Sequence, residues 1–243
     1  MTISDPAFCL VAPLALPEDE VQLWRLDLEA VSGSEDRWQQ LLSADEQARA
    51  RRFVSARVRS HFMATRGVLR ARLGGYLGTD PAGLAFHYSA RNKPSLAPPH
   101  GASGVSFNVA HSGGLALLAF ARGREVGVDV EQVRDLDVEG IARRFFSPCE
   151  QKQLAAVPPE DKRETFFRCW TKKEAYIKAK GEGLWLPLHQ FDVSVAAGSE
   201  NALLATRPDE SEAARWTLRE VSVGPGYVAA LCVEGRDFRV RDR

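Results

Sequence analysis

The sequence is poor in cysteine, and its cysteines are not arranged to bind a metal or to form a disulfide framework. The four of them, Cys9, Cys149, Cys169 and Cys232, are scattered through 243 residues, with no Cys-x-x-Cys pair and no histidine at metal-ligand spacing. This scatter favours small apolar side chains in a reduced protein. A zinc site and a disulfide scaffold are therefore not expected.

Long hydrophobic runs and an excess of charge are lacking as well. The apolar stretch FCLVAPLAL near the start is short, contains a proline and has no positively charged start. It is a poor signal peptide and too short to cross a bilayer, so we expect a cytoplasmic protein with no membrane partner. Basic and acidic residues number 32 each, so net charge predicts no partner, and a nucleic acid is not expected.

The distribution of charge is more informative than its sum. The segment RARRFVSARVRSHFMATRGVLRAR, residues 49–72, carries eight arginines and no acid. One interpretation is a solvated helix face. The other is a pocket for an anion, because a guanidinium group binds phosphate oxygens in a two-pronged fork. Both interpretations stay open at this point.

Strand-like and helix-like patterns follow each other in the first part of the chain. Residues 21–28 place Trp24, Leu26 and Leu28 on one face of a strand. The pattern Ser-x-x-Glu at Ser43 to Glu46 is typical of a helix start, and residues 57–77 show a longer helical pattern. The segment LAFHYSARNKPSL is typical of strand, turn and strand, with RNKP as the turn.

A boundary between two halves is predicted at the turn 122–124. Two apolar runs with the composition of strands, 105–121 and 125–133, flank this turn. We therefore divide the chain into an N-terminal half, 1–122, and a C-terminal half, 123–243.

The second half repeats the first in outline. After its first strand come helical patterns near 138–155 and 161–180, and then the strand patterns FDVSV, RWTLREVSV and YVAALCV. Hairpin-like strands with segregated helices favour the α+β class over a doubly wound parallel sheet.

The stretch VGVDVE, residues 126–131, combines a buried strand pattern with two acids. Side chains alternate along a strand, so the three valines face one way while Asp129 and Glu131 face the other. The two carboxylates then lie roughly 7 Å apart and repel each other unless a cation is near. A wet sheet edge, or pairing with arginines, would also accommodate them.

The stretch WTKKEAYIKAKGEGL, residues 170–184, has the pattern of a helix that ends near Gly181. Trp170, Glu174 and Lys178 line one face at i, i+4 and i+8. Taken alone, Glu174 and Lys178 make an ordinary surface pair. Beside Asp129 and Glu131, however, a third carboxylate would complete a set of oxygen ligands suited to Mg²⁺. The remaining lysines are expected on the surface: Lys172, Lys173 and Lys180.

Together, GVDVE and WTKKEAYIKAKGEGL resemble the two signatures of the 4′-phosphopantetheinyl transferases of the large, single-chain, surfactin-synthetase-activating type. Further segments resemble that family: SADEQARARRF, NKP, SFNVAHSG and RRFFSPCE. The matches run from about Trp24 to Tyr227. Asn92 stands where the family usually has glycine before Lys-Pro, and Ala110 stands where many members have serine before histidine. Glu46 stands at a position that is basic in some relatives.

The resemblance implies a reaction and a set of roles. A serine of an acyl or peptidyl carrier protein attacks coenzyme A, giving holo carrier protein and adenosine 3′,5′-bisphosphate. Asp129, Glu131 and Glu174 would hold Mg²⁺, and Lys178 would contact the transferred phosphate. Glu174, or a water that it orients, would take the serine proton. Asp129, Glu174 and Lys178 are thus the expected catalytic residues.

The resemblance also implies how coenzyme A is held. Arg49, with Arg57 and Arg66 as further candidates, would bind the 3′-phosphate, and Lys93 and His111 would contact other phosphates. Pro94 and Ala110 are the neighbours expected to line the same site. The implied fold has two similar halves related by a pseudo-twofold axis. Each is a small, mostly antiparallel sheet packed with helices, with the ligand in the cleft between them, in a monomer.

Two alternatives remain. A magnesium-dependent exonuclease also begins its site with Asp-x-Glu on a strand, but the further acids that it needs are absent at the right spacing near the C-terminus. A catalytically inactive relative that binds carrier protein or nucleotide would keep the fold and lose the chemistry. The sequence leaves open whether the carrier belongs to fatty-acid, polyketide or non-ribosomal-peptide synthesis.

Overall fold

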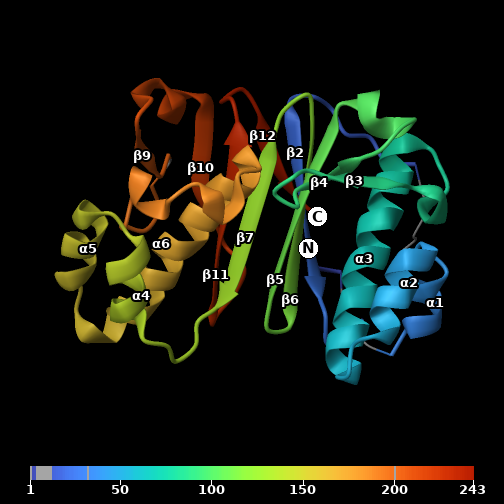
Figure 1. Cartoon of the computed structure of the whole chain (residues 1–243), viewed down its shortest axis with the longest axis horizontal. Helices are drawn as coiled ribbons and strands as arrows, with labels where there is room; N and C mark the ends of the chain where they lie inside the picture. Colours follow the sequence, from blue (N-terminus) through green and yellow to red (C-terminus); the bar gives the residue numbers. More distant parts are fainter. Residues whose placement is uncertain (1, 4–12, 32, 200) are drawn as a thin grey trace.

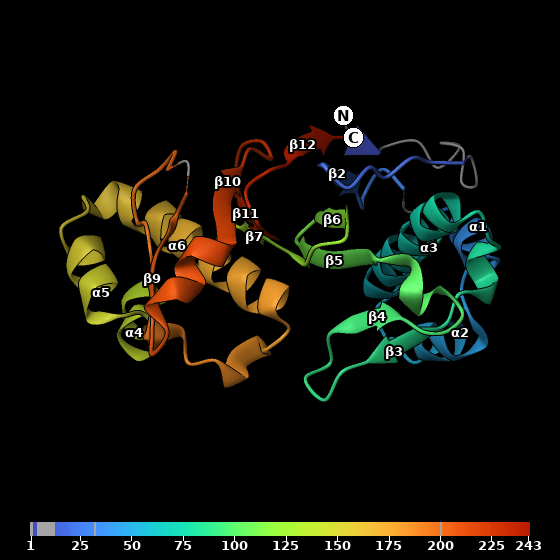
Figure 2. The same cartoon turned by 90° about the horizontal axis from the view of Figure 1, so that it is seen from above.

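The computed structural model describes residues 2–3, 13–31, 33–199 and 201–243; Cys9 lies outside them. Two separate sheets stand side by side in the middle of the molecule, and helices cover the outer side of each (Figure 1). Seen from above, one group of helices lies at each end (Figure 2). The α+β class with small, mostly antiparallel sheets is confirmed. The pseudo-twofold relation stays a prediction.

The first sheet is built around a long apolar hairpin. Strands β5 (Val105–Ser112) and β6 (Leu115–Arg122) pair antiparallel, and β6 pairs in turn with β2 (Glu20–Asp27). Two short strands lie parallel to β2, namely β1 (Thr2–Ile3) and β12 (Arg239–Asp242). The last strand of the chain therefore joins the sheet of the N-terminal residues. The division into halves at 122 stays a prediction.

Three helices and a hairpin pack on the outer side of the first sheet. The helices are α1 (Glu35–Gln39), α2 (Ala44–Arg51) and α3 (Ala56–Leu77), and the hairpin is β3 (Phe86–Tyr88) with β4 (Pro94–Leu96). The capping box of Ser43 and Glu46 at the start of α2 is confirmed. So is the turn at Asn92, whose φ of 62° is one that asparagine tolerates.

The second sheet has the order β10 (Trp216–Val221), β11 (Tyr227–Glu234), β7 (Val126–Gln132), and all its pairs are antiparallel. Helix α6 (Pro159–Lys180) packs over β7 and β11. Two helices, α4 (Val138–Phe145) and α5 (Pro148–Ala155), pack beside it. A small hairpin of β8 (Phe191–Val193) and β9 (Leu203–Thr206) completes this side. Short 3-10 turns lie at Pro81–Gly83, His100–Ser103, Gly183–Trp185, Leu188–Gln190 and Glu210–Arg215.

The arginines of residues 49–72 divide between surface and interior. Arg49, Arg51, Arg52 and Arg57 are exposed. Arg70 is buried, and its guanidinium donates to Glu46 and to the carbonyls of Pro81 and Leu84. A solvated helix face therefore accounts for only some of these residues.

Two of the lysines expected on the surface are buried, which corrects that expectation. Lys172 and Lys173 are both 0% exposed. The Nζ atom of Lys172 donates to the carbonyls of Ser194 and Ala196, and that of Lys173 donates to those of Leu188 and Phe191. The long side chains are buried because backbone carbonyls of a distant segment satisfy their ammonium groups together with one carboxylate each, Glu220 for Lys172 and Glu150 for Lys173. Lys180 is half-buried and pairs with Glu182 and Glu212.

Among the described cysteines, Cys169 and Cys232 are buried free thiols, whereas Cys149 is exposed. The expectation of small apolar core residues thus holds for two of the three. Within the described residues, no helix combines the length and apolar content needed to cross a bilayer.

Candidate functional site

A glycine brings the two motifs together. A Cβ atom at Gly127 on β7 would overlap the carbonyl oxygen of Ala175 and the backbone of Ala179 in α6. The absence of a side chain lets the helix lie directly on the strand. Because Glu174 and Lys178 flank these two alanines in α6, the close approach places both beside the acidic face of β7.

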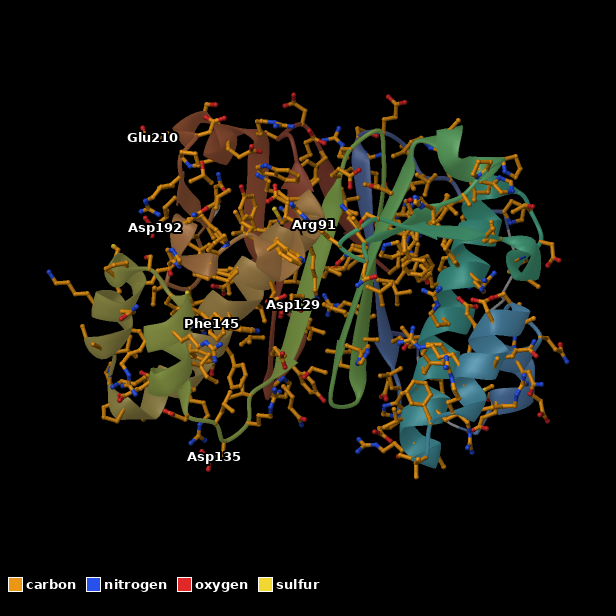
Figure 3. The ribbon with its side chains drawn as sticks, viewed as in Figure 1. Arg91, Asp129, Asp135, Phe145, Asp192 and Glu210 are labelled. Atoms are coloured by element: carbon orange, nitrogen blue, oxygen red, sulfur yellow. The ribbon has the colours of Figure 1, made fainter. Side chains whose placement is uncertain are left out.

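Alternation along β7 is confirmed. Val126, Val128 and Val130 are buried in the core between the two sheets. Asp129 is 6% exposed and Glu131 is half-buried. Figure 3 labels Asp129 on β7, beside α6. The valines therefore pack in the apolar core, whereas the acids face the helix, as the period-two pattern predicts.

Asp129 pairs with Lys178. The Nζ atom of Lys178 lies 2.6 Å from Oδ1 of Asp129 and donates weakly to the carbonyl of Val128 at 3.4 Å. Burial raises the pKa of Asp129 to about 6, although the charge of Lys178 opposes that shift. The second oxygen, Oδ2, is buried and has no hydrogen-bond partner among the described residues. A buried carboxylate oxygen without a donor is a position suited to a cation.

Glu174 belongs to the same electrostatic cluster. Burial raises its pKa to about 7, and the charges of Asp129 and Glu131 raise it further while Lys178 lowers it. In the described part of the chain Glu174 forms no hydrogen bond or ion pair, so its charge has no direct compensation. Three carboxylates gathered this closely repel one another, and a divalent cation would stabilise them.

Glu131 is held by two donors at one of its oxygens. Oε2 accepts from the hydroxyl of Ser112 at 2.7 Å and from Arg134 at 2.8 Å. Among the described residues, no three histidine, cysteine or acidic side chains already converge as a finished metal site. The residue types fit a magnesium ion, but the pair between Lys178 and Asp129 occupies part of the cluster.

A cavity of about 620 Å³ lies beside this cluster, on the side of the first sheet. It contains most of the residues expected to bind coenzyme A. Most of the lining residues come from α2, α3 and the loop between them, and the others come from the β3–β4 hairpin and from β5 with the turn that follows it. The lining is Arg49, Phe53, Arg57, Val58, His61, Phe62, Thr65, Arg66, Tyr88, Asn92, Pro94, Val109, His111 and Gly113.

The three arginines of the cavity differ in how far they are already paired. Arg57 lies 2.5 Å from exposed Glu29. Arg66 pairs with buried Glu46 and lies over the ring of Phe86. Arg49 lies over the ring of Phe62 and pairs with no carboxylate in the described part of the chain. Its guanidinium is therefore the most available for an anionic ligand.

Two histidines line the cavity, and one of them, His111, lies near the charges of the carboxylate cluster. His111 lines the cavity, and its pKa is lowered by burial and then by the charges of Lys178 and His61, against Glu131. His61 lines the same cavity, with Nε2 3.4 Å from Oε1 of Glu29. Burial lowers the pKa of His61 as well. Sequence reasoning missed His61, whose only signal was its place among the arginines of α3.

Two expected ligand contacts lie elsewhere. Ala110 alternates away from His111 and is buried between the sheets, so its side chain does not line the cavity. The Nζ atom of Lys93 lies 2.5 Å from Oε2 of Glu125 and 2.6 Å from the carbonyl of Ala179. This lysine ties the β3–β4 hairpin to the end of α6. Their roles toward coenzyme A stay predictions.

The fold and these side chains together indicate the class of protein. A strand and a helix present three carboxylates and an ammonium group next to a cavity lined by arginine, histidine and aromatic rings. Hard oxygen donors beside cationic donors are the groups that proteins use to bind magnesium and phosphate esters. The site therefore has the composition of a phosphate-handling enzyme.

Family models give the class its name. Residues 125–232 match the model of the 4′-phosphopantetheinyl transferase superfamily, and residues 32–122 match that of the 4′-phosphopantetheinyl transferase N-terminal region. The chain is 41% identical to the 4′-phosphopantetheinyl transferase HetI of Nostoc sp. over 223 residues, which cover 91% of each protein. The chain belongs to the 4′-phosphopantetheinyl transferase family.

The chain is also similar to a more distant relative and, over about half of its length, to solved structures. The chain is 28% identical to the 4′-phosphopantetheinyl transferase Sfp of Bacillus subtilis strain 168, over 84% of this chain and 87% of that protein. Among solved structures, the holo-[acyl-carrier-protein] synthase of Thermotoga maritima matches 45% of this chain and 62% of its own, at 21% identity and a TM-score of 0.36. The Chronobacterium ammoniagenes ACPS–CoA complex matches 46% of this chain and 98% of its own, at 18% identity and a TM-score of 0.35.

Proposed function

We propose that this chain transfers the 4′-phosphopantetheine group of coenzyme A to a serine of an acyl or peptidyl carrier protein. The products are the holo carrier protein and adenosine 3′,5′-bisphosphate. The observation that carries the proposal is the cluster of Asp129, Glu131, Glu174 and Lys178, placed beside a cavity lined by arginines and histidines. The names of the relatives, which are 4′-phosphopantetheinyl transferases, support the same reaction.

The positive charges that line the cavity complement the phosphates of coenzyme A. Arg49, assisted by Arg57 and Arg66, is the proposed contact for the 3′-phosphate, since a guanidinium group suits an exposed monophosphate. His111 lies between this cavity and the carboxylates and is the proposed contact for the pyrophosphate. The remaining proposed neighbours of coenzyme A are Lys93, Pro94 and Ala110.

Asp129, Glu131 and Glu174 are the proposed ligands of Mg²⁺. Their oxygen atoms are the donors that this ion prefers, and the partnerless Oδ2 of Asp129 supports the assignment. When bound, the ion would neutralise negative charge on the pyrophosphate.

The chain's own side chains account for the rest of the chemistry. The serine oxygen forms a bond to the phosphorus that bears pantetheine, and the bond from that phosphorus to the bridging oxygen breaks. The leaving group is adenosine 3′,5′-bisphosphate. Glu174, with a pKa near 7, or a water that it orients, takes the serine proton. The ammonium group of Lys178 stabilises charge that develops on the phosphate oxygens.

The oligomeric state, the location in the cell and the carrier partner are also proposed. The chain is proposed to act as a monomer of two halves divided near residue 122, with coenzyme A between them. The free thiols of the described cysteines support a location in the reducing cytoplasm. The carrier protein is identified only by its chemistry, as an apo protein with a serine that accepts the group.

An intact-mass measurement tests the reaction. The purified chain, Mg²⁺ and coenzyme A are incubated with apo carrier proteins from fatty-acid, polyketide and non-ribosomal-peptide pathways. A carrier should gain the mass of one phosphopantetheine group, and Asp129→Ala should abolish that gain while the protein stays folded. Binding of coenzyme A without a mass gain on any carrier would favour the inactive relative instead.

A further inference from the structure

Strand β7, which carries the two acids, is an edge strand of its own sheet. It pairs with β11 on one side. On the other side it faces β5 of the first sheet, and the two strands lie side by side (Figure 1). Among the described residues no backbone ladder joins β5 to β7. The backbone groups along this edge therefore need partners from somewhere else.

Side chains of β5 supply those partners. Three polar residues at even-numbered positions of β5 face the edge of β7 or the turn before it. The hydroxyl of Ser106 donates to the carbonyl of Arg124, and the amide oxygen of Asn108 accepts the N–H of Val128 at 2.9 Å. The hydroxyl of Ser112 accepts the N–H of Gln132 at 3.1 Å.

Two of these contacts lie immediately on either side of the acids. Asn108 holds the residue before Asp129, and Ser112 holds the residue after Glu131. Ser112 also donates its only proton to Oε2 of Glu131, at 2.7 Å. A hydroxyl that accepts from a backbone N–H and donates to a carboxylate has a fixed orientation. Ser112 therefore links the backbone of β7 to the orientation of Glu131.

We infer that Ser112 is a positioning residue for the proposed cation site, with Asn108 fixing the strand that carries the site. The inference rests on the proposed function, because it concerns the same three carboxylates. With Oε2 of Glu131 held by Ser112, Oε1 is left to face the cation. The first sheet thus orients ligands that belong to the second sheet.

Arg134 is the other donor to Oε2, and it holds Glu131 less firmly. Its side chain is 51% exposed, whereas that of Glu131 is 21% exposed. An ion pair with an exposed arginine contributes little, because water screens it and the long side chain loses entropy. Ser112, by contrast, sits on a strand and is anchored to the backbone of β7. Residues of this kind behind a metal ligand usually change metal affinity by about 10- to 100-fold.

The test measures cation binding and not turnover. Mg²⁺ is titrated by calorimetry into the full chain saturated with coenzyme A, with no carrier protein present. Ser112→Ala should weaken Mg²⁺ binding about tenfold, and Ser112→Thr, which keeps the hydroxyl, should restore it. Ser106→Ala is the matched control, because it removes a hydroxyl contact from the same strand face, far from the acids. It should leave Mg²⁺ affinity unchanged, and thermal unfolding is recorded for every variant.

The outcomes separate this inference from the proposed function. Unchanged Mg²⁺ affinity in Ser112→Ala, or an equal loss in Ser106→Ala, would overturn the positioning role. If Asp129→Ala also bound Mg²⁺ like the wild type, the proposed site itself would be wrong. If Asp129→Ala lost binding while Ser112→Ala kept it, only the role of Ser112 would fail.

Discussion

The ammonium group of Lys178 lies 2.6 Å from a carboxylate oxygen of Asp129, in a part of the molecule where that carboxylate is almost inaccessible to water. The pair joins helix α6 to strand β7. In the proposed reaction, the same ammonium group would stabilise the phosphate during transfer. Its pairing with Asp129 holds it beside the cluster before the substrates bind.

Replacing Lys178 should therefore slow the chemical step more than it weakens binding. We predict that Lys178→Met lowers the single-turnover transfer rate at least about 100-fold, since loss of one charge-stabilising donor commonly costs that much. Mg²⁺ affinity should change much less. Lys180→Met, two residues further along α6, is the control and should retain activity. An unchanged rate in Lys178→Met would return this lysine to the role of a simple ion-pair partner.

The raised pKa of Glu174 predicts how stability depends on pH without a divalent cation. Its value rises from 4.5 to about 7 in the fold, so the folded chain binds the proton more tightly than the unfolded chain. The stability from this carboxyl is present below about pH 4.5 and is lost as the pH rises through 7. Asp129, raised to about 6, acts in the same direction.

Glu174→Gln should consequently be more stable than the wild type at pH 8 in a chelator. The gain should be of the order of 2 kcal/mol, or roughly 4–8 °C in thermal unfolding, and it should vanish near pH 4.5. Adding Mg²⁺ should remove most of the difference by stabilising the wild type. Glu139→Gln serves as control, because the pKa of exposed Glu139 is lowered by Lys162. If Glu174→Gln differed from the wild type by the same amount at pH 8 and at pH 4.5, the coupling of the carboxylates would be contradicted.

The cavity arginines should differ in how much each contributes to binding the 3′-phosphate of coenzyme A. Arg49 has no carboxylate partner in the described residues, whereas Arg66 is held by buried Glu46. We predict that Arg49→Ala raises KM for coenzyme A about tenfold and leaves KM for 3′-dephospho-coenzyme A unchanged, since one charge-assisted contact contributes about 1.5–3 kcal/mol. Arg51→Ala, on the exposed side of α2, is the control. Equal losses for both substrates would argue against a contact between Arg49 and the 3′-phosphate.

Two variants separate two roles for Lys93, which are contact with a phosphate of coenzyme A and a tie between the β3–β4 hairpin and α6. If it contacts a phosphate of coenzyme A, Lys93→Met should raise KM for coenzyme A severalfold. Glu125→Gln, which removes its present partner, should leave KM within about twofold, because the ammonium group would then be freer to reach the ligand. Steady-state kinetics with coenzyme A at saturating carrier protein measure both. Identical effects of the two variants would instead mean that Lys93 only ties the hairpin to α6.

Local patterns predicted the acidic strand and the helix facing it. Valine–acid alternation in VGVDVE fixes which side chains point away from the core, because the strand period is two. The i, i+4 spacing of Glu174 and Lys178 fixes their common helix face. Gly181, with φ of 73°, ends that helix where a left-handed residue was expected. These features depend on residues close together in the sequence.

Features set by distant contacts could not be predicted in the same way. The roles of Ser112 and His61 depend on which strand lies beside β5 and on what faces α3. Glu46 fits a capping box by spacing, and that pattern is present, but its oxygens also bind Arg66 and Arg70 from α3. No short-range pattern distinguishes a buried ion pair from an exposed one, since both use the same residue types.

Lys173 is the clearest example of a buried ion pair that the local sequence does not reveal. The sequence places it beside the proposed catalytic Glu174 on a helix, yet it is 0% exposed and lies 2.8 Å from buried Glu150 of α5. Lys173→Met should lower the free energy of unfolding by about 3–5 kcal/mol, because it leaves a buried carboxylate without its cation. The double variant Lys173→Met/Glu150→Gln should recover part of that loss, since no buried charge then remains. Lys152→Met, on the exposed side of α5, should change stability by less than about 0.5 kcal/mol. Urea unfolding monitored by circular dichroism measures all three, and a loss under about 1 kcal/mol in Lys173→Met would contradict a buried, charged pair.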